Sequence, residues 1–320
     1  MRIAVVGAGA VGGYFGGRLA EAGEDVVFLA RGAQLDAIRT RGLRVSSSQG
    51  DFTIDPVRVV EDPRDAGLVD AVLLAVKAWQ VPEIAATLAP MLRSTSFVVP
   101  LQNGVEAPRQ LNEVLGEGRV LGGLCRVLAS VTEPGHIEQN GVDPYIAFGE
   151  LDGSRTPRTE RLRAAFANAR GVTAEIPEDI VAAMWAKFLF IAAFGGVGAI
   201  TRSTAGVIRT QPETRRLLVQ ALEEARQVAL AHRVRLPENV VARIMELIDQ
   251  LPEQGTASMQ RDIAAGRPSE LDSQSGAVVR LGEEVGVAVP VHTLIYQSLL
   301  PLERRARAHP RRETSPAAGS

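Results

Sequence analysis

The sequence predicts an α/β domain with a parallel sheet, followed by an all-helical domain. Two observations carry this prediction. In the first half of the chain, short apolar runs typical of buried strands alternate with helical stretches, which is the pattern of a parallel sheet. After about residue 178 the strand-like runs stop and only helical patterns follow. Strands followed by a run of helices indicate separate domains.

The first thirty residues predict a strand–helix–strand unit. Residues 2–6 form a continuous apolar run, residues 7–12 a glycine-rich turn, and residues 11–22 a helix ended by Gly23. Residues 26–30 form the second strand. Two parallel strands joined by a helix are the basic unit of an α/β sheet.

Further strands are predicted at 69–76 and 96–101, with helices at 79–91 and 106–115. From 119 to 148 the pattern becomes β-rich, with turn signals at Pro134-Gly135 and Asn140-Gly141. We expect these to be mostly antiparallel strands that close the same domain.

The second half predicts six helices, at 179–194, 212–232, 237–251, 256–265, 272–285 and 291–307. In the second of them the apolar residues share one face: Leu217, Leu218, Ala221, Leu222, Ala225, Val228 and Ala229. We therefore expect an α/β domain over 1–177, a helical domain over 178–306, and a disordered basic and then Pro/Ser/Ala-rich tail over 307–320.

One stretch, Ile180 to Ile200, is long and apolar enough to cross a membrane. Lys187 near its middle and the glycines at 195, 196 and 198 favour a buried helix followed by a glycine-rich turn. The N-terminus lacks the basic region of a signal peptide, so we expect a cytoplasmic protein with no membrane partner.

Composition excludes several classes of protein. A net charge of −2 gives no general attraction for nucleic acid. The single cysteine, Cys125, excludes an internal disulfide framework and a cysteine-rich metal site. The four histidines show no metal-ligand spacing, so we expect no metal.

The most informative motif is Gly7-x-Gly9-x-x-Gly12. It follows a strand and opens a helix, which is the context of a dinucleotide-binding Rossmann fold. Gly7 permits the tight turn, Gly9 lets the backbone approach a pyrophosphate, and Gly12 lets the helix pack on the strand. The motif therefore predicts that the domain over 1–177 is a dinucleotide-binding α/β Rossmann domain, which the all-helical C-terminal domain then follows as the substrate and catalytic domain.

The residue after the second strand indicates which dinucleotide binds. NAD-binding folds usually carry an acidic residue there for the ribose 2′-hydroxyl. This chain has Arg31, which suits a 2′-phosphate and predicts NADPH. The alternative is an ordinary surface arginine.

Lys77 and Asn103 each follow a predicted parallel strand. Open α/β sheets bind ligands at the carboxyl ends of their strands, so both are candidate cofactor and substrate ligands. Taken separately, each could be a plain loop residue.

Lys187 is the only charge in its apolar stretch. Burial favours the neutral amine, which suits proton transfer at working pH. The alternative is a lysine whose ammonium group reaches solvent along its aliphatic stem.

The chain resembles the ketopantoate reductase (2-dehydropantoate 2-reductase) family over nearly its whole length. The resemblance runs through GAGAVGGYFGGRLAEAG, LLAVKAWQ, PLQNGVE, MWAKFLF, SMQRDIAAGRPSELDSQSG and VPVHTLIY. It implies that the glycines hold the pyrophosphate and Arg31 the 2′-phosphate of NADPH, with Lys77 and Asn103 lining the cofactor and substrate cleft. It also implies Lys187 as the general acid, Ser258 as a substrate ligand, Glu270 as a substrate-binding and active-site residue, and a homodimer.

Ser258 and Glu270 also have structural interpretations, as a helix-start residue and a first-turn helix carboxylate. The chain departs from the family where typical members carry substrate-binding asparagines, four and eight residues after the lysine. Ile191 and Gly195 stand there. Losing polar partners can change specificity strongly.

The expected reaction is hydride transfer from NADPH to the carbonyl of a 2-oxo acid, ketopantoate or a relative, as in pantothenate biosynthesis. One alternative is an NADPH-dependent reductase of a more apolar carbonyl or imine. The other is a non-catalytic NADPH-binding sensor.

Overall fold

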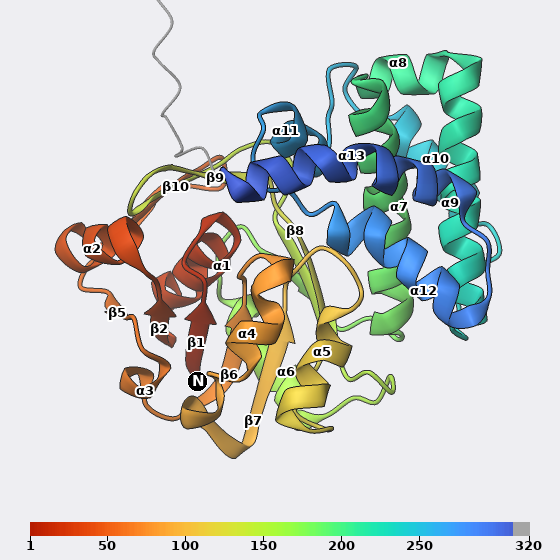
Figure 1. The fold of residues 1–320 in the computed structure, drawn as a ribbon. Helices are drawn as coiled ribbons and strands as arrows, with labels where there is room; N and C mark the ends of the chain where they lie inside the picture. Colours follow the sequence, from red (N-terminus) through yellow and green to blue (C-terminus); the bar gives the residue numbers. More distant parts are fainter. Residues whose placement is uncertain (310–320) are drawn as a thin grey trace, which may run out of the picture. The chain divides into compact units, whose positions relative to one another are not determined.

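The computed structural model describes residues 1–309. The chain forms two compact units (Figure 1). Unit 1 comprises Met1–Gln102 and Ala107–Ile180, and unit 2 comprises Asn103–Glu106 and the chain from Val181 onwards. The short segment Asn103–Glu106 thus groups with the helical half, whereas the sequence predicts a single boundary between residues 177 and 178.

Unit 1 is built on a five-stranded, entirely parallel sheet, confirming the predicted fold class. The strand order is β5-β2-β1-β6-β7. The strands are β1 (Arg2–Val6), β2 (Asp25–Leu29), β5 (Arg58–Val60), β6 (Val69–Leu74) and β7 (Leu92–Pro100). The order reverses between β1 and β6, and this switch point is where open α/β sheets bind ligands.

The alternating faces of the strands bury two separate cores. Ile3 and Val5 of β1 pack in a core with α1 (Ala10–Glu21). Ala4 and Val6 face the opposite way and pack with α3 (Pro63–Ala66), α4 (Val81–Ala85) and α5 (Ala107–Leu115). Helices therefore cover both faces of the sheet.

The β-rich region after residue 119 contributes to two small sheets, one of which also contains β3 and β4 from earlier in the chain. Their strand orders are β4-β3-β10-β9 and β12-β11-β8. The pairs β9–β10 and β8–β11 are antiparallel as expected, whereas β3–β10 and β11–β12 are parallel. The strands are β3 (Leu43–Ser47), β4 (Phe52–Ile54), β8 (Gly122–Arg126), β9 (Ala129–Glu133), β10 (His136–Gln139), β11 (Tyr145–Gly149) and β12 (Thr173–Glu175). Two further helices complete unit 1, α2 (Gly32–Arg41) and α6 (Pro157–Ala167).

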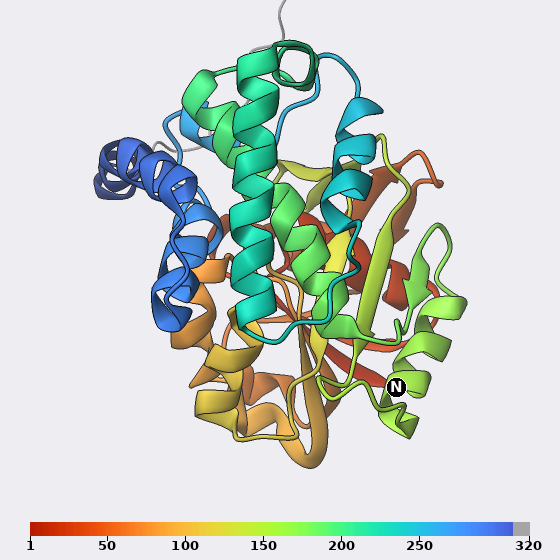
Figure 2. The same ribbon diagram turned by 90° about the vertical axis from the view of Figure 1, so that its right-hand side faces the viewer.

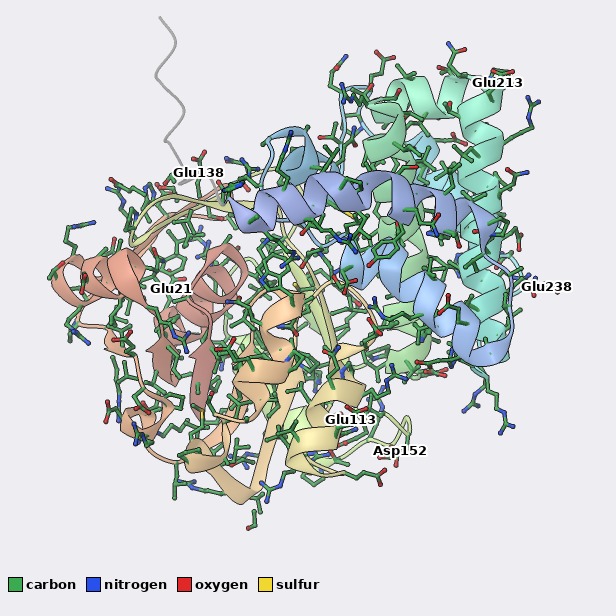
Figure 3. The ribbon with its side chains drawn as sticks, in the orientation of Figure 1. Glu21, Glu113, Glu138, Asp152, Glu213 and Glu238 are labelled. Carbon is green, nitrogen blue, oxygen red and sulfur yellow. The ribbon has the colours of Figure 1, made fainter. Side chains whose placement is uncertain are left out.

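Unit 2 is helical throughout its described part. Its helices are α7 (Ile180–Thr201, from Val181), α8 (Ala205–Thr210), α9 (Pro212–Ala231), α10 (Val240–Asp249), α11 (Ser258–Ala264), a π-helix (Asp272–Gly276), α12 (Ala277–Val285) and α13 (Pro290–Ala308). α7 and α9 lie side by side in one apolar core (Figures 1 and 2). The predicted apolar face of α9 is confirmed, since all its members except the half-buried Leu217 are buried. Acidic side chains such as Glu213 and Glu238 lie on the outside of this unit (Figure 3).

The expected glycine-rich turn after residue 194 is wrong, because α7 continues through it to Thr201. These glycines allow close packing. A Cβ at Gly196 would lie 3.1 Å from Ile295, and one at Gly198 only 2.5 Å from the Gln260 side chain. α7 is long and apolar enough to cross a membrane, and 61% of its most apolar window is buried inside the structure. That burial is typical of a core helix.

Two other predicted elements need correction. The helix expected over 79–91 is broken into a 3-10 turn (Ala78–Gln80), α4 and a second 3-10 turn (Ala89–Met91). Pro82 and Pro90 explain the breaks, because proline lacks the N–H that a helix interior needs. The disordered tail expected from residue 307 is wrong for its first two residues, since α13 extends to Ala308. The rest of that prediction, residues 310–320, lies outside the described residues.

Candidate active site

The glycine loop of unit 1 has the shape that a pyrophosphate needs. Gly7 has φ +98°, and its amide donates to the Leu29 carbonyl at the end of β2. A Cβ at Gly12 would lie 2.1 Å from the Gly7 carbonyl oxygen, so only glycine fits there. A Cβ at Gly9 would meet nothing within 4 Å, which leaves open space beside the first turn of α1. The backbone therefore fits a phosphate group at the helix N-terminus.

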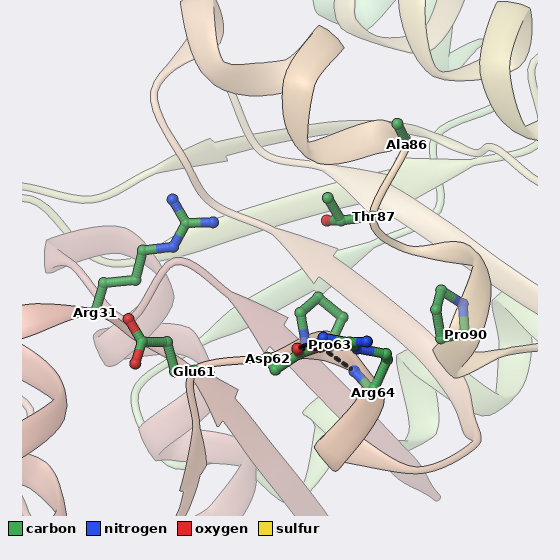
Figure 4. Close-up of a pocket in the computed structure, with 8 residues that line it drawn as sticks. All are labelled: Arg31, Glu61, Asp62, Pro63, Arg64, Ala86, Thr87 and Pro90. Atoms are coloured by element: carbon green, nitrogen blue, oxygen red, sulfur yellow. Dashed lines mark hydrogen bonds and ion pairs between the residues drawn. The ribbon is translucent and has the colours of Figure 1, made fainter.

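Arg31 lies at the N-cap of α2 and lines a pocket of about 570 Å³ in the same unit (Figure 4). Its side chain makes no hydrogen bond or ion pair within residues 1–309. Arg64, in the same pocket, is held by Asp62 through its Nε and Nη2 atoms. That pair lowers the pKa of the Asp62 carboxyl to about 2. The other lining residues are Glu61, Pro63, Ala86, Thr87 and Pro90.

The predicted ligand Lys77 follows β6 and is exposed. Its Nζ lies 5.8 Å from the centre of the Trp79 ring. The buried Gln102 side chain ties the neighbouring strand to this loop, because its Nε2 donates to the carbonyl oxygens of Leu74 (2.8 Å) and Val76 (3.0 Å). The loop after β6, which leads to Lys77, and the end of β7 at Gln102 are thereby held together within unit 1.

Asn103 and Glu270 meet within unit 2. The Asn103 side-chain amide donates to Glu270 Oε2 at 2.8 Å. Glu270 is buried, with only 8% of its surface exposed, and it precedes the π-helix. Glu270 is therefore a buried, hydrogen-bonded carboxylate that precedes the helix, and not the first-turn helix carboxylate of the alternative interpretation.

An ion-pair network holds the segment that carries Asn103. Glu106 Oε2 accepts from Arg280 Nη2 at 2.8 Å, and Arg280 Nη1 donates to Asp272 Oδ1 at 3.0 Å. The Tyr296 hydroxyl also donates to that oxygen, at 2.9 Å. π-helical turns are frequent at functional sites, and here the turn is braced from two sides.

Lys187 lies half-buried on α7, among the residues of the large apolar core. Ile191 and Gly195 follow it at intervals of four and therefore share its face of the helix. The structure thus places the two positions where the resemblance implies asparagines along the same helix face as the candidate acid.

Ser258 is exposed at the first position of α11, one residue after the N-cap Ala257. Its hydroxyl makes no hydrogen bond among the described residues, so it does not cap the helix. Ser258 stays a predicted substrate ligand.

Sequence reasoning missed Gln274. Its side chain is 1% exposed, and its Oε1 lies 3.3 Å from where a Cβ at Gly195 would stand. The available signal was its spacing, four residues after Glu270 in a helical stretch. Met259 and Ala257 also border the Gly195 position, at 3.3 and 3.5 Å.

The comparisons with known proteins agree with this geometry. A family model described as ketopantoate reductase PanE/ApbA matches residues 3–153, and the model of its C-terminal domain matches residues 179–303. Within residues 1–309, no cluster of three or more His, Cys, Asp or Glu side chains could hold a metal ion.

Individual relatives cover almost the entire chain. A 2-dehydropantoate 2-reductase of Mesorhizobium japonicum is 33% identical, covering 91% of this chain and 94% of its own. An uncharacterized oxidoreductase of Bacillus subtilis is 29% identical, covering 93% and 98%. The crystal structure of a PanE/ApbA family ketopantoate reductase from Ralstonia eutropha superposes with a TM-score of 0.87 at 31% identity, covering 96% and 100%.

Proposed function

Because the chain belongs to the ketopantoate reductase family of oxidoreductases, we propose that it reduces a 2-oxo acid to the 2-hydroxy acid with NADPH. The first candidate substrate is 2-dehydropantoate, which relatives such as the Mesorhizobium enzyme are named for. The product would then be pantoate, and the enzyme would serve pantothenate biosynthesis in the cytoplasm.

The observation that carries the proposal is the hydrogen bond between Asn103 and Glu270. Two polar residues 167 positions apart in the chain are brought to 2.8 Å at a π-helical turn. Burying a carboxylate costs free energy unless it has partners. The buried Glu270 side chain beside Asn103 therefore supports a role in ligand binding.

The residues of unit 2 supply the proton and the substrate contacts. Lys187 Nζ donates a proton to the carbonyl oxygen as negative charge develops on it. Asn103 and Glu270 orient the polar groups of the substrate, and the Ser258 hydroxyl binds it from the start of α11. NADPH, when bound, supplies the hydride that reaches the carbonyl carbon.

Arg31 supports NADPH as the reductant. Its guanidinium group lines the pocket without a protein partner, whereas Arg64 is already neutralised by Asp62. A cation with no carboxylate partner is suited to a 2′-phosphate.

Ile191 and Gly195 favour a second candidate, an NADPH-dependent reductase of a more apolar carbonyl or imine compound. Neither residue offers a side-chain hydrogen bond to a polar substrate.

Oxidation of NADPH at 340 nm tests both candidates. We expect turnover with ketopantoate and with other 2-oxo acids at kcat/KM values far above those for simple ketones and cyclic imines. The proposal is wrong if the purified protein binds NADPH and reduces only ketones or imines. It is also wrong if NADPH binds and no compound of the panel is turned over.

A further inference from the structure

The Gln274 side chain carries a buried acceptor without a donor. Only 1% of the residue is exposed, and its Oε1 has no hydrogen-bond partner among the described residues. A buried polar atom left unpaired destabilises the fold, so native proteins keep few of them outside functional sites. Gln260, a second buried glutamine against α7, shows the ordinary arrangement: its Nε2 donates to the Ser203 carbonyl oxygen at 2.9 Å.

The unpaired oxygen lies at the position that lacks the family's asparagine. A Cβ at Gly195 would be 3.3 Å from Gln274 Oε1, so an asparagine side chain would enter the volume that the glutamine amide fills. Gly195 shares its helix face with Lys187 and Ile191. The amide of Gln274 in the π-helix therefore lies against α7 at Gly195.

Gln274 is also one helical turn from the candidate substrate carboxylate. Its backbone amide donates to the Glu270 carbonyl oxygen at 3.0 Å, and the Glu270 side chain accepts from Asn103. A glutamine side chain rotates about several single bonds, so its amide can turn toward a ligand beside Glu270 without backbone movement.

The chemistry of the acceptor restricts what can pair with it. The ketone and the carboxylate of a 2-oxo acid only accept hydrogen bonds, and a carbonyl oxygen also only accepts. A hydroxyl group elsewhere on the substrate is the donor that matches Oε1.

Resting on the proposed 2-oxo acid reduction, we propose that Gln274 Oε1 accepts a hydrogen bond from a hydroxyl group of the substrate. Gln274 thereby selects hydroxylated 2-oxo acids over the matching acids that lack the hydroxyl.

A matched pair of substrates tests this directly. Ketopantoate and 3,3-dimethyl-2-oxobutanoate differ only by the hydroxyl group. We expect wild-type kcat/KM to favour ketopantoate, and Gln274→Leu to reduce that preference by roughly tenfold or more, through ketopantoate alone. The melting temperature of Gln274→Leu should stay equal or rise, because the change removes an unpaired polar atom.

Two further variants make the test specific. Gln260→Leu removes a buried glutamine whose amide is already paired, so it should lower stability and leave the substrate preference unchanged. Adding Gly195→Asn to Gln274→Ala should restore part of the preference, because the alanine leaves room for the asparagine amide.

The outcomes distinguish a failure of the Gln274 assignment from a failure of the proposed 2-oxo acid reduction. If wild type reduces both acids equally well, or if Gln274→Leu keeps the wild-type preference, the Gln274 assignment is wrong while 2-oxo acid reduction stands. A strongly lowered melting temperature with an unchanged preference identifies Gln274 as a structural residue and overturns the assignment as well. If no 2-oxo acid is reduced at all, the proposed function itself fails and this assignment with it.

Discussion

The side-chain amide of Asn103 donates a hydrogen bond to the Glu270 carboxylate, with 2.8 Å between Nδ2 and Oε2. The contact joins the loop after β7 to the residues before the π-helix. The ion pair between Glu106 and Arg280 of α12 holds the same loop in place. The hydrogen bond therefore holds the Glu270 side chain in one orientation.

This pairing predicts that Asn103 and Glu270 act as one unit on the substrate. Asn103→Ala and Glu270→Ala should each reduce kcat/KM for a 2-oxo acid, and the double variant should lose less than the product of the single losses. The coupling energy in such a cycle is typically about 0.5–3 kcal/mol for residues in contact. Steady-state kinetics of the four proteins measure it, and strictly additive losses would show that the two side chains act independently.

The parallel sheet could be predicted from the sequence because its signals are local. Apolar runs such as 2–6 and 69–76 are bounded by turn residues, and the glycine motif appears in its full context. The β-rich region was harder, since β10 pairs with β3 about ninety residues earlier, and no local pattern encodes that partner.

The candidate site could be predicted only in part, because some of its contacts join residues that are far apart in the chain. Lys187 stands out in the sequence because it is the one charge in an apolar helix. Gln274 does not, because its meaning depends on the missing side chain at Gly195, which packs against it from a helix 79 residues earlier in the chain. The glycines of α7 led to the wrong prediction of a turn after residue 194. Glycine destabilises an isolated helix, but here close packing against neighbouring helices outweighs that cost.

Arg31 should determine the choice of dinucleotide. Arg31→Ala removes the cation that lines the pocket, so the Kd for NADPH should rise about tenfold or more while the Kd for NADH changes little. Arg64→Ala is the matched control, because Asp62 already occupies that guanidinium group. Fluorescence titration of both cofactors measures the effect. An equal loss for NADPH and NADH would contradict a role in binding the 2′-phosphate.

Under the proposed function, Ile191 should limit the polar contacts of the substrate, one helical turn from Lys187. Ile191→Asn introduces a side-chain amide at this half-buried position, where the resemblance implies one. We expect it to raise kcat/KM for ketopantoate relative to apolar 2-oxo acids, at a modest cost in stability from lost apolar burial. Ile191→Val, which keeps the surface apolar, serves as the control. A relative preference that moves equally in both variants would point to a change in packing instead.

His292 should make the stability of the helical unit depend on pH. The ring is fully buried, and burial lowers its pKa to about 4, although its Nε2 donates to the Ala221 carbonyl oxygen at 3.0 Å. Unfolded histidine takes up a proton near pH 6.5, so the unfolded state binds more protons between these values, and stability falls as the pH drops. Since each pH unit is worth about 1.4 kcal/mol, the loss approaches roughly 3 kcal/mol by pH 4.

Urea denaturation at several pH values, for wild type and His292→Leu, checks this expectation. The free energy of unfolding of the variant should fall less steeply over the acidic range. Comparing the two proteins separates the contribution of His292 to the pH dependence from that of Glu224. The Glu224 carboxylate accepts a hydrogen bond from the His292 backbone amide, and burial raises its pKa. Parallel pH profiles for the two proteins would contradict the prediction.

Lys187 should be the proton donor of the reaction. General acid catalysis typically contributes about 10²–10⁴-fold, so Lys187→Met should reduce kcat within that range. Methionine keeps most of the packing volume on α7 and removes the charge, which makes it a sharper test than Lys187→Ala. The affinity for NADPH should stay nearly unchanged, because the proposed phosphate ligands, the glycine loop and Arg31, belong to unit 1.

The accompanying measurements decide how a loss of activity is interpreted. Retained NADPH affinity and melting temperature with a reduced kcat assign the proton transfer to Lys187. A near-normal kcat in Lys187→Met means that the lysine is structural, and Lys77 then becomes the next candidate, to be tested by Lys77→Met. Lys77 is exposed beside Trp79, so its substitution should not disturb the apolar core, and its effect on kcat can be compared directly with that of Lys187.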